Sequence, residues 1–169
     1  MPPNPLPRYL SVRKIEGILN AALKCFLAKD QALLSTKAHE RTVTYRIAGY
    51  LEPLLPGWHV DCEYNRQGVL PDPKSDAEGK RVFPDVIVHI RGKKQNLLVL
   101  EVKPAWAARN LKLADREKLL RILQVHHYRH AYLLHYSADT NAIPTFERVE
   151  LPKQHIQSNR SAVIPLPLP

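Results

Sequence analysis

Two apolar segments joined by a short connector constrain the fold more than any other feature of the sequence. Residues 82–91 (VFPDVIVHIR) and 97–103 (LLVLEVK) both predict β-strands. Residues 92–96 (GKKQN) between them have the glycine and the length of a hairpin loop. Because the second segment is apolar at nearly every position, we expect its strand to be covered on both faces. The rest of the chain must therefore supply a packing layer on each side of a sheet.

The segments around this hairpin predict helices and further strands. Apolar side chains recur at helical spacing in residues 12–34, about 36–54 and about 111–125. Sequence patterns of the strand type occupy residues 58–65, 130–136 and 145–150. The order of helix, three meandering strands, helix and strand predicts an α/β fold, in which a mixed sheet is flanked by helices. The first of these segments adds an extra N-terminal helix.

We expect one domain over residues 1–169, because a chain of this length can bury enough surface around a single core. Prolines cluster in residues 1–8 and 161–169 and predict extended tails. Cys25 and Cys62 lie far apart and predict two buried free thiols. No uncharged apolar stretch approaches the roughly 18 residues of a membrane span, and the first residues lack the apolar core of a signal peptide. A cytoplasmic protein without membrane contact is therefore expected.

The chain carries an excess of positive charge. Its 25 lysines and arginines stand against 16 acids, which gives a formal net charge of +9. This excess favours a polyanionic partner, because phosphates attract it and release counterions on contact. Residues 66–81 hold two glycines and two prolines and predict a mobile loop. Arg66, Lys80 and Arg81, with Lys74, lie in this loop and are candidate phosphate contacts, although an ordinary solvated loop explains them almost as well.

An acid and a lysine interrupt the second apolar segment near its end. The side-chain period of two in a strand places Glu101 and Lys103 on one face, together with Leu97 and Val99. Burial of a carboxylate and an ammonium is strongly unfavourable unless each finds partners, so the pair indicates a functional site. The alternative is a fraying strand end at which both side chains reach water.

The expected geometry places two further acids near this pair. In a hairpin centred on residues 93–94, Asp85 lies opposite residues 101–103, at the end far from the turn. Taken alone, Asp85 is better explained as a cap where its strand begins. Glu40 lies seven residues before Ile47 and so shares the apolar stripe of its helix. A glutamate in a first helical turn also complements the helix dipole, which explains Glu40 equally well.

Two or three carboxylates beside one lysine are typical of an oxygen-ligand site for Mg²⁺ or Mn²⁺. An ion in such a site neutralises phosphate and lowers the pKa of a bound water. A lysine beside it orients or deprotonates that water and offsets the developing charge. These residues therefore predict hydrolysis of phosphodiester bonds.

A known family shows the same pattern of residues. Pro84-Asp85, followed by Glu101-Val102-Lys103 after an apolar run, resembles the signature of the PD-(D/E)XK nuclease superfamily. The resemblance covers about residues 36–137 and implies the restriction-endonuclease-like fold with its αβββαβ core. It also implies that Asp85 and Glu101 bind the metal, that Lys103 is the catalytic lysine, and that Glu40 is the acid supplied by the first core helix. Stretches like WHVDCEYNR and FPDVIVH are similar to small bacterial members of the superfamily.

The expected function is thus a Mg²⁺- or Mn²⁺-dependent nuclease, in which Glu40 helps to bind or position the metal. Nucleic acid is the expected partner, with DNA favoured over RNA, and a homodimer is the common route to cutting both strands of a duplex. The family resemblance implies a product with a 5′-phosphate. The runner-up is a catalytically silent nucleic-acid-binding or assembly protein on the same fold. A third alternative is a basic structural domain with a solvated strand end.

Weaker signals add little to this prediction. His126 and His130 have the i,i+4 spacing of a helical metal pair, but no HExxH motif or cysteine cluster accompanies them. Gln124 is a weak candidate for a polar helper on the helix after the lysine. Asp61 and Glu63 share a strand face and predict a solvated surface. The sequence contains no glycine-rich phosphate loop and no serine-hydrolase elbow, which argues against those two chemistries.

Overall fold

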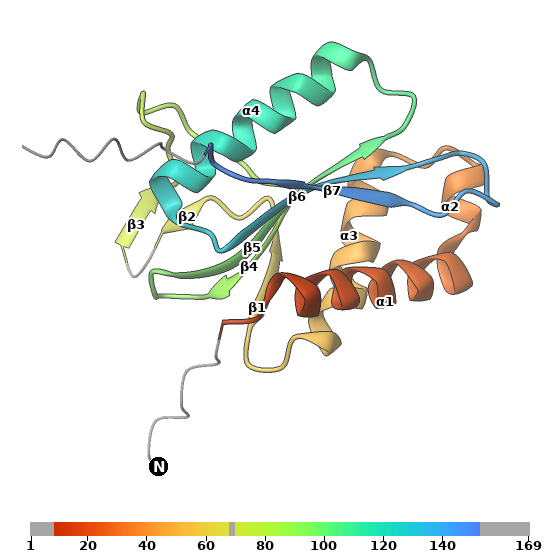
Figure 1. The fold of residues 1–169 in the computed structure, drawn as a ribbon, viewed down its shortest axis with the longest axis horizontal. Coiled ribbons are helices and arrows are strands. Elements are labelled where there is room, and N and C mark those ends of the chain that lie inside the picture. The colour runs from red at the N-terminus through yellow and green to blue at the C-terminus, as the bar shows by residue number, and fades with distance from the viewer. Residues whose placement is uncertain (1–8, 68–69, 153–169) are drawn as a thin grey trace, which may run out of the picture.

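A five-stranded mixed sheet lies at the centre of the computed structural model, which describes residues 9–67 and 70–152 (Figure 1). In spatial order the strands are β1 (His59–Cys62), β4 (Val86–Ile90), β5 (Gln95–Pro104), β6 (His130–Tyr136) and β7 (Thr145–Val149). Strands β1, β4 and β5 are antiparallel neighbours, β6 runs parallel to β5, and β7 is antiparallel to β6. The predicted class, an α/β fold with a mixed sheet flanked by helices, is confirmed.

The register of the central hairpin follows the sequence prediction. Val86 lies opposite Leu100, and a bulge between Val88 and His89 shifts the pairing by one residue near the turn. The bulge lets β5 begin at Gln95, so the connector is shorter than expected. Gly92 in this turn has a φ of +74°, a conformation that glycine adopts without strain. The hairpin therefore places the start of β4 and the end of β5 at the same end of the sheet, far from the turn.

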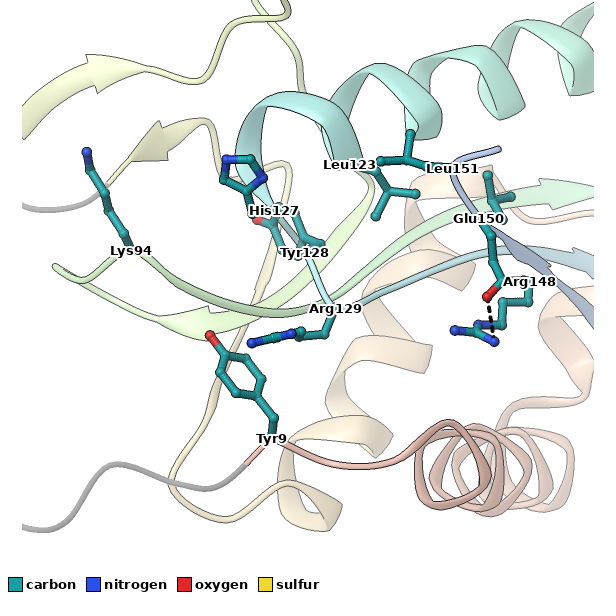
Figure 2. Close-up of a pocket in the computed structure, with 10 residues that line it drawn as sticks. Tyr9, Lys94, Leu123, His127, Tyr128, Arg129, Arg148, Glu150 and Leu151 are labelled. Carbon is teal, nitrogen blue, oxygen red and sulfur yellow. Dashed lines mark ion pairs between the residues drawn. The ribbon is translucent and has the colours of Figure 1, made fainter. Parts of the chain in front are cut away.

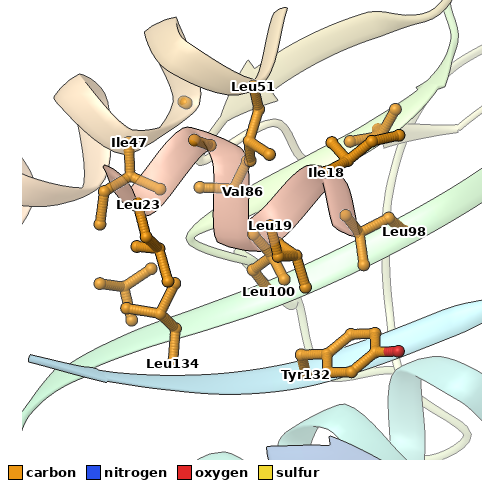
Figure 3. Packing of buried hydrophobic residues seen from close by; sticks show 14 of the residues in the cluster. Ile18, Leu19, Leu23, Ile47, Leu51, Val86, Leu98, Leu100, Tyr132 and Leu134 are labelled. Carbon is orange, nitrogen blue, oxygen red and sulfur yellow. The ribbon is translucent and has the colours of Figure 1, made fainter. Parts of the chain in front are cut away.

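Helices cover both faces of the sheet (Figure 1). Helices α1 (Val12–Asp30) and α3 (Glu40–Leu51) lie on one face, and α4 (Arg109–His126) lies on the other. Because side chains alternate along a strand, β4 and β5 divide theirs between the two layers. Val86, Leu98 and Leu100 pack with the first pair of helices (Figure 3), whereas Ile87 and Val99 pack against α4. The near-continuous apolar run in β5 is explained by this double coverage.

Helix α4 connects two parallel neighbours, β5 and β6, as a crossover must. It is longer than the predicted 111–125, because it begins directly after the short loop that follows β5. Leu119, Ile122 and Leu123 form its buried side. This packing fixes which of the polar residues on α4 face the end of β5.

The two helical segments predicted before the sheet each contain a helix and a separate short turn. The first ends at Asp30, and a separate turn, α2, follows at Ala32–Ser35. Helix α3 begins at Glu40 rather than Thr36, because Lys37 has a φ of +49° and His39 caps the helix through its ring nitrogen Nδ1. A 3₁₀ turn, η1 (Glu52–Leu54), completes the predicted segment. The later start makes Glu40 the first residue of α3.

The loop predicted at 66–81 contains more structure than expected. It forms a two-stranded ribbon of β2 (Arg66–Gln67) and β3 (Leu70–Pro73). Lys74 is buried and donates from Nζ to the Arg66 carbonyl at 2.6 Å. This part of the predicted mobile loop therefore contains paired strands, and burial excludes Lys74 as a phosphate contact.

Two further expectations are corrected. The predicted strand 58–65 is limited to β1, because Glu63 has a φ of +49° that ends it. Cys25 is exposed and Cys62 partly buried, so the prediction of two buried thiols is wrong. The proline-rich tails at 1–8 and 161–169 lie outside the described residues. Within the described part of the chain, no helix has the length and apolar character needed to cross a membrane.

Candidate active site

Asp85 and the end of β5 meet as the hairpin register requires. Asp85 immediately precedes β4, and its Oδ2 accepts a hydrogen bond at 2.8 Å from the backbone N–H of Val102. The backbone carbonyl of Asp85 accepts a second hydrogen bond from the N–H of Glu63 at 3.2 Å. These contacts fix the carboxylate beside Glu101 and Lys103, at the end of the hairpin far from its turn.

Glu101 is completely buried on the α4 side of the sheet. Lys118 of α4 reaches it, with Nζ 2.8 Å from each carboxylate oxygen. A buried carboxylate paired with one ammonium group is expected of a functional site, whereas at a frayed strand end the carboxylate would reach water. For Glu101, the alternative of a solvated strand end is therefore wrong.

Lys103 lies between helices α3 and α4. Its Nζ donates to Glu40 Oε1 at 2.6 Å and lies 3.7 Å from Asp115 Oδ2 of α4. Glu40 occupies the first position of α3, and its side chain is 31% exposed. Glu40 thus stands at a helix start and also contacts Lys103, so neither explanation of this residue is excluded. Glu40, Asp85, Glu101, Lys103, Asp115 and Lys118 are called the charge cluster below.

The pKa values within the charge cluster reflect burial of like charges. Burial and the negative charge of Asp85 raise the pKa of Glu101 to about 8, against the opposing effect of Lys118. Burial also raises the pKa of Asp85, although the Val102 N–H lowers it in part. The pKa of Asp115 is raised by burial, with Lys103 opposing. For Lys103, burial lowers the pKa, but the hydrogen bond to Glu40 and nearby carboxylates outweigh it, so the net shift is upward.

The charge cluster fits a divalent cation in its chemistry. Four carboxylates stand against two ammonium groups, and burial, the largest cause, raises the pKa values of Glu101 and Asp85. Oxygen ligands of this kind suit Mg²⁺ or Mn²⁺. In the described residues, however, no group of three or more histidine, cysteine or acidic side chains is arranged around one metal position. Lys118 donates a hydrogen bond to Glu101 Oε2 and lies 2.8 Å from Oε1, which has no hydrogen-bond partner in the described residues, so the ammonium group would have to move before Glu101 could bind a metal.

Lys118 and Asp115 are site residues that the sequence did not reveal. Their i,i+3 spacing places them on one face of α4. A charged face of a helix is usually solvated, so nothing in the pattern pointed them toward Glu101. The only available signal was the expectation that a buried acid needs a partner, which does not say where that partner comes from.

Other predicted residues lie outside the charge cluster. Arg66, Lys80 and Arg81 are exposed, and within the described ranges no hydrogen bond or ion pair joins them to it. Gln124 is also exposed. His126 and His130 are buried, and their Nε2 atoms lie 2.9 Å and 2.8 Å from the carbonyl oxygens of Ser75 and Leu10. These contacts explain both histidines without a zinc ion.

Asp61 departs from the predicted solvated strand face. Its carboxylate is paired with the guanidinium of Arg91 and lies 2.8 Å from His89 Nε2. Burial raises its pKa, but these two partners outweigh burial and the net shift is downward. Glu63, by contrast, is an exposed partner of Arg41. Asp61 therefore belongs to a polar contact between β1 and β4 and does not compete for a metal.

Two hollows adjoin the charge cluster and share Glu40. One, of about 390 Å³, is lined by Asp85, Glu63 and Tyr45 among others and is called the Tyr45 hollow. The second, of about 350 Å³, includes Lys103 and Trp106 and is called the Trp106 hollow. The charge cluster is thus open to a ligand on both the Asp85 side and the Lys103 side of Glu40.

A hollow larger than these two lies at the opposite end of the sheet, and Figure 2 shows the residues that line it. It has a volume of about 560 Å³ and is lined by Tyr9, Arg129 and Arg148 among others. Arg148 is paired there with Glu150 at 2.7 Å, and the Arg129 guanidinium lies 4.4 Å from the centre of the Tyr9 ring. No residue of the charge cluster lines this hollow, so size does not identify the candidate site.

Comparison of the chain with protein-family models, with curated proteins and with solved structures found no match.

Proposed function

We propose that this protein is a metal-dependent nuclease that hydrolyses phosphodiester bonds of DNA or RNA. The observation that carries the proposal is the convergence of Asp85, Glu101 and Lys103 at one end of the hairpin. Complete burial of Glu101 beside a second carboxylate is unfavourable for the fold alone, which supports a functional role for the pair. A carboxyl group such as Glu101, whose pKa is strongly raised beside other charged groups, is typical of functional sites.

The topology supports the same proposal. Helix α3, the meander β1-β4-β5, helix α4 and the parallel strand β6 follow one another in the order of the αβββαβ core. Strand β7 and the β2–β3 ribbon are additions to that order. In this interpretation the chain has the restriction-endonuclease-like fold, with its site at the end of the second and third core strands.

Five residues of the charge cluster are assigned roles in the proposed reaction. Asp85 and Glu101 would hold Mg²⁺ or Mn²⁺, which supplies phosphate neutralisation and a more acidic bound water. Lys103 would orient the attacking water and offset the charge that develops on the phosphate. Glu40, 2.6 Å from Lys103 Nζ, would position that ammonium group. Lys118 would have to move away from Glu101 before the carboxylate could serve as a ligand.

One observation favours the alternative of a catalytically silent binding protein on this fold. Lys118 already contacts both carboxylate oxygens of Glu101. A site that is neutralised by its own lysine needs no metal for stability. The two proposals differ in turnover, since a silent protein would bind nucleic acid without cutting it.

The test is a cleavage assay with labelled single- and double-stranded DNA and RNA in Mg²⁺, Mn²⁺ or EDTA. Lys103→Ala is purified in parallel, with Lys93→Ala in the exposed hairpin turn as the matched control. We expect metal-dependent cutting that Lys103→Ala loses and Lys93→Ala retains. Cutting that survives in Lys103→Ala would contradict the assigned site. Binding without cutting in any metal would favour the silent protein.

A further inference from the structure

Trp106 places a large aromatic surface beside the proposed catalytic lysine. The Trp106 hollow is lined by the charged residues Lys103, Glu40 and Asp115 and by apolar residues that include Trp106, Leu111 and Pro104. Trp106 is 51% exposed and Leu111 is 52% exposed. An exposed tryptophan that shares a hollow with charged residues adds little to the core, so a ligand is the better explanation for its position.

The indole is held in place by its surroundings. The N–H of Ala105 donates to the Tyr136 carbonyl at 2.6 Å, and Lys112 Nζ donates to the Ala105 carbonyl at 2.6 Å. The N–H of Ala107 closes a turn onto the Pro104 carbonyl at 3.0 Å. The Trp106 ring meets the buried Tyr136 ring edge to face, with centroids 5.7 Å apart. A fixed ring of this kind can bind a flat partner without losing side-chain entropy.

The charges around the hollow favour an anionic partner with a flat apolar part. In the hollow itself Lys103 stands against the carboxylates of Glu40 and Asp115. Arg109 and Lys112 in the first turn of α4 next to it make the local charge balance positive. The Tyr45 hollow lies on the other side of Glu40, and its Tyr45 side chain is 67% exposed. Two exposed aromatic rings thus flank the charge cluster.

We propose that the Trp106 hollow receives an unpaired nucleobase beside the phosphate at Lys103, and that the substrate is therefore single-stranded nucleic acid. This inference rests on the proposed function. Bases in a duplex are stacked on each other and cannot offer a face to the indole. In a single strand each base has a free face, and base–aromatic stacking tolerates any sequence.

Intrinsic fluorescence gives a direct readout, because the chain has only two tryptophans. Trp58 is 7% exposed within the core cluster, so Trp58→Phe leaves Trp106 as the single reporter. The full chain is titrated in EDTA, which prevents metal-dependent cutting, with oligo-dT, oligo-U and a DNA duplex of equal length. We expect quenching of Trp106 by either single strand and little quenching by the duplex.

Fluorescence anisotropy of a labelled strand measures binding independently of the tryptophans. We expect Trp106→Ala to weaken binding of single strands by about 5- to 150-fold, the range that corresponds to loss of one stacked base. Trp106→Phe should retain most of the affinity, because its ring still stacks. Leu113→Ala on α4 is the control for loss of an equally exposed apolar side chain outside the hollow.

The outcomes separate this inference from the proposed function. Single-strand binding that neither quenches Trp106 nor weakens in Trp106→Ala would overturn the inference and leave the nuclease proposal intact. Equal quenching by the duplex would also overturn it. Absence of binding to every nucleic acid would contradict the proposed function together with the inference.

Discussion

Glu101 stabilises the fold in its protonated form, whereas its proposed role as a metal ligand needs the ionised form. Its pKa is raised to about 8 by burial and by Asp85, whereas an unfolded glutamate titrates near 4.5. The folded state therefore binds a proton at this carboxyl more tightly than the unfolded state does. The resulting stability is fully present below about pH 4.5 and is lost as the pH rises through about 8.

We therefore expect Glu101→Gln to flatten this pH dependence. In urea unfolding with EDTA present, the free energy of unfolding of the variant relative to wild type should increase from pH 5 to pH 8. Buried histidines such as His89 and His126 have pKa values that are lowered mainly by burial, so they change the stability with pH in the opposite direction. Because both proteins contain these histidines, the difference in stability between them isolates Glu101. A difference that stays constant between pH 5 and pH 8 would contradict the pKa assigned to Glu101.

Lys118 stabilises the fold by pairing with Glu101, but the same contact competes with a metal ion. We expect Lys118→Met to lower the free energy of unfolding by about 2 kcal/mol, less than for a fully buried pair because Lys118 is partly exposed and Glu101 can take up a proton. Removal of the competing charge should also strengthen Mn²⁺ binding on the order of tenfold. Calorimetric titration with Mn²⁺ measures the affinity, and Lys93→Met is the control. Weaker Mn²⁺ binding in Lys118→Met would refute its role as a competitor.

At the scale of the elements, the start of α3 is joined to the end of β5 by the contact between Glu40 and Lys103. We expect Glu40→Gln to reduce the cleavage rate by about 10- to 100-fold, the usual effect of losing a group that orients a reacting residue. Mn²⁺ affinity should be unchanged, because Glu40 contacts Lys103 and acts through it. Glu52→Gln, just beyond the other end of α3, is the matched control. A loss of metal affinity in Glu40→Gln would make Glu40 a ligand instead.

The central hairpin could be predicted from the sequence because two constraints determine it. The period of two assigns each side chain to a face, and the short turn sets the register, so Asp85 had to lie near Glu101 and Lys103. The β2–β3 ribbon was missed because its glycines and prolines give the composition of a loop. Burial of Lys74 was missed because it depends on how that ribbon folds back on Arg66.

The contacts that complete the charge cluster depend on tertiary packing. Lys118 meets Glu101 because packing of Leu119 and Ile122 against the sheet fixes the rotation of α4 about its own axis. A change of rotation would turn Lys118 toward solvent, and the sequence pattern allows both. For the same reason the hollow beside Trp106 could not be predicted, since it arises between the β5–α4 loop and the start of α3.

At the scale of the whole molecule, the positive charge and the acidic site have separate roles. The net charge of +9 favours approach of a polyanion from any direction. The charge cluster, by contrast, holds four carboxylates against two ammonium groups, so the proposed hydrolysis there needs a cation that offsets its acids. Every proposed role of Asp85, Glu101 and Lys103 therefore depends on one event, the binding of a divalent metal ion in the charge cluster.

The melting temperature in Mn²⁺ against EDTA tests that event most directly, because a ligand that binds only the folded state stabilises it. At a concentration one hundred times the dissociation constant, the stabilisation is about 2.7 kcal/mol, which should raise the melting temperature by several degrees. We expect this shift to disappear in Asp85→Asn and in Glu101→Gln and to persist in the Glu52→Gln control. A shift that survives in both site variants, or a wild type without any shift, would contradict the metal site on which the proposed nuclease depends.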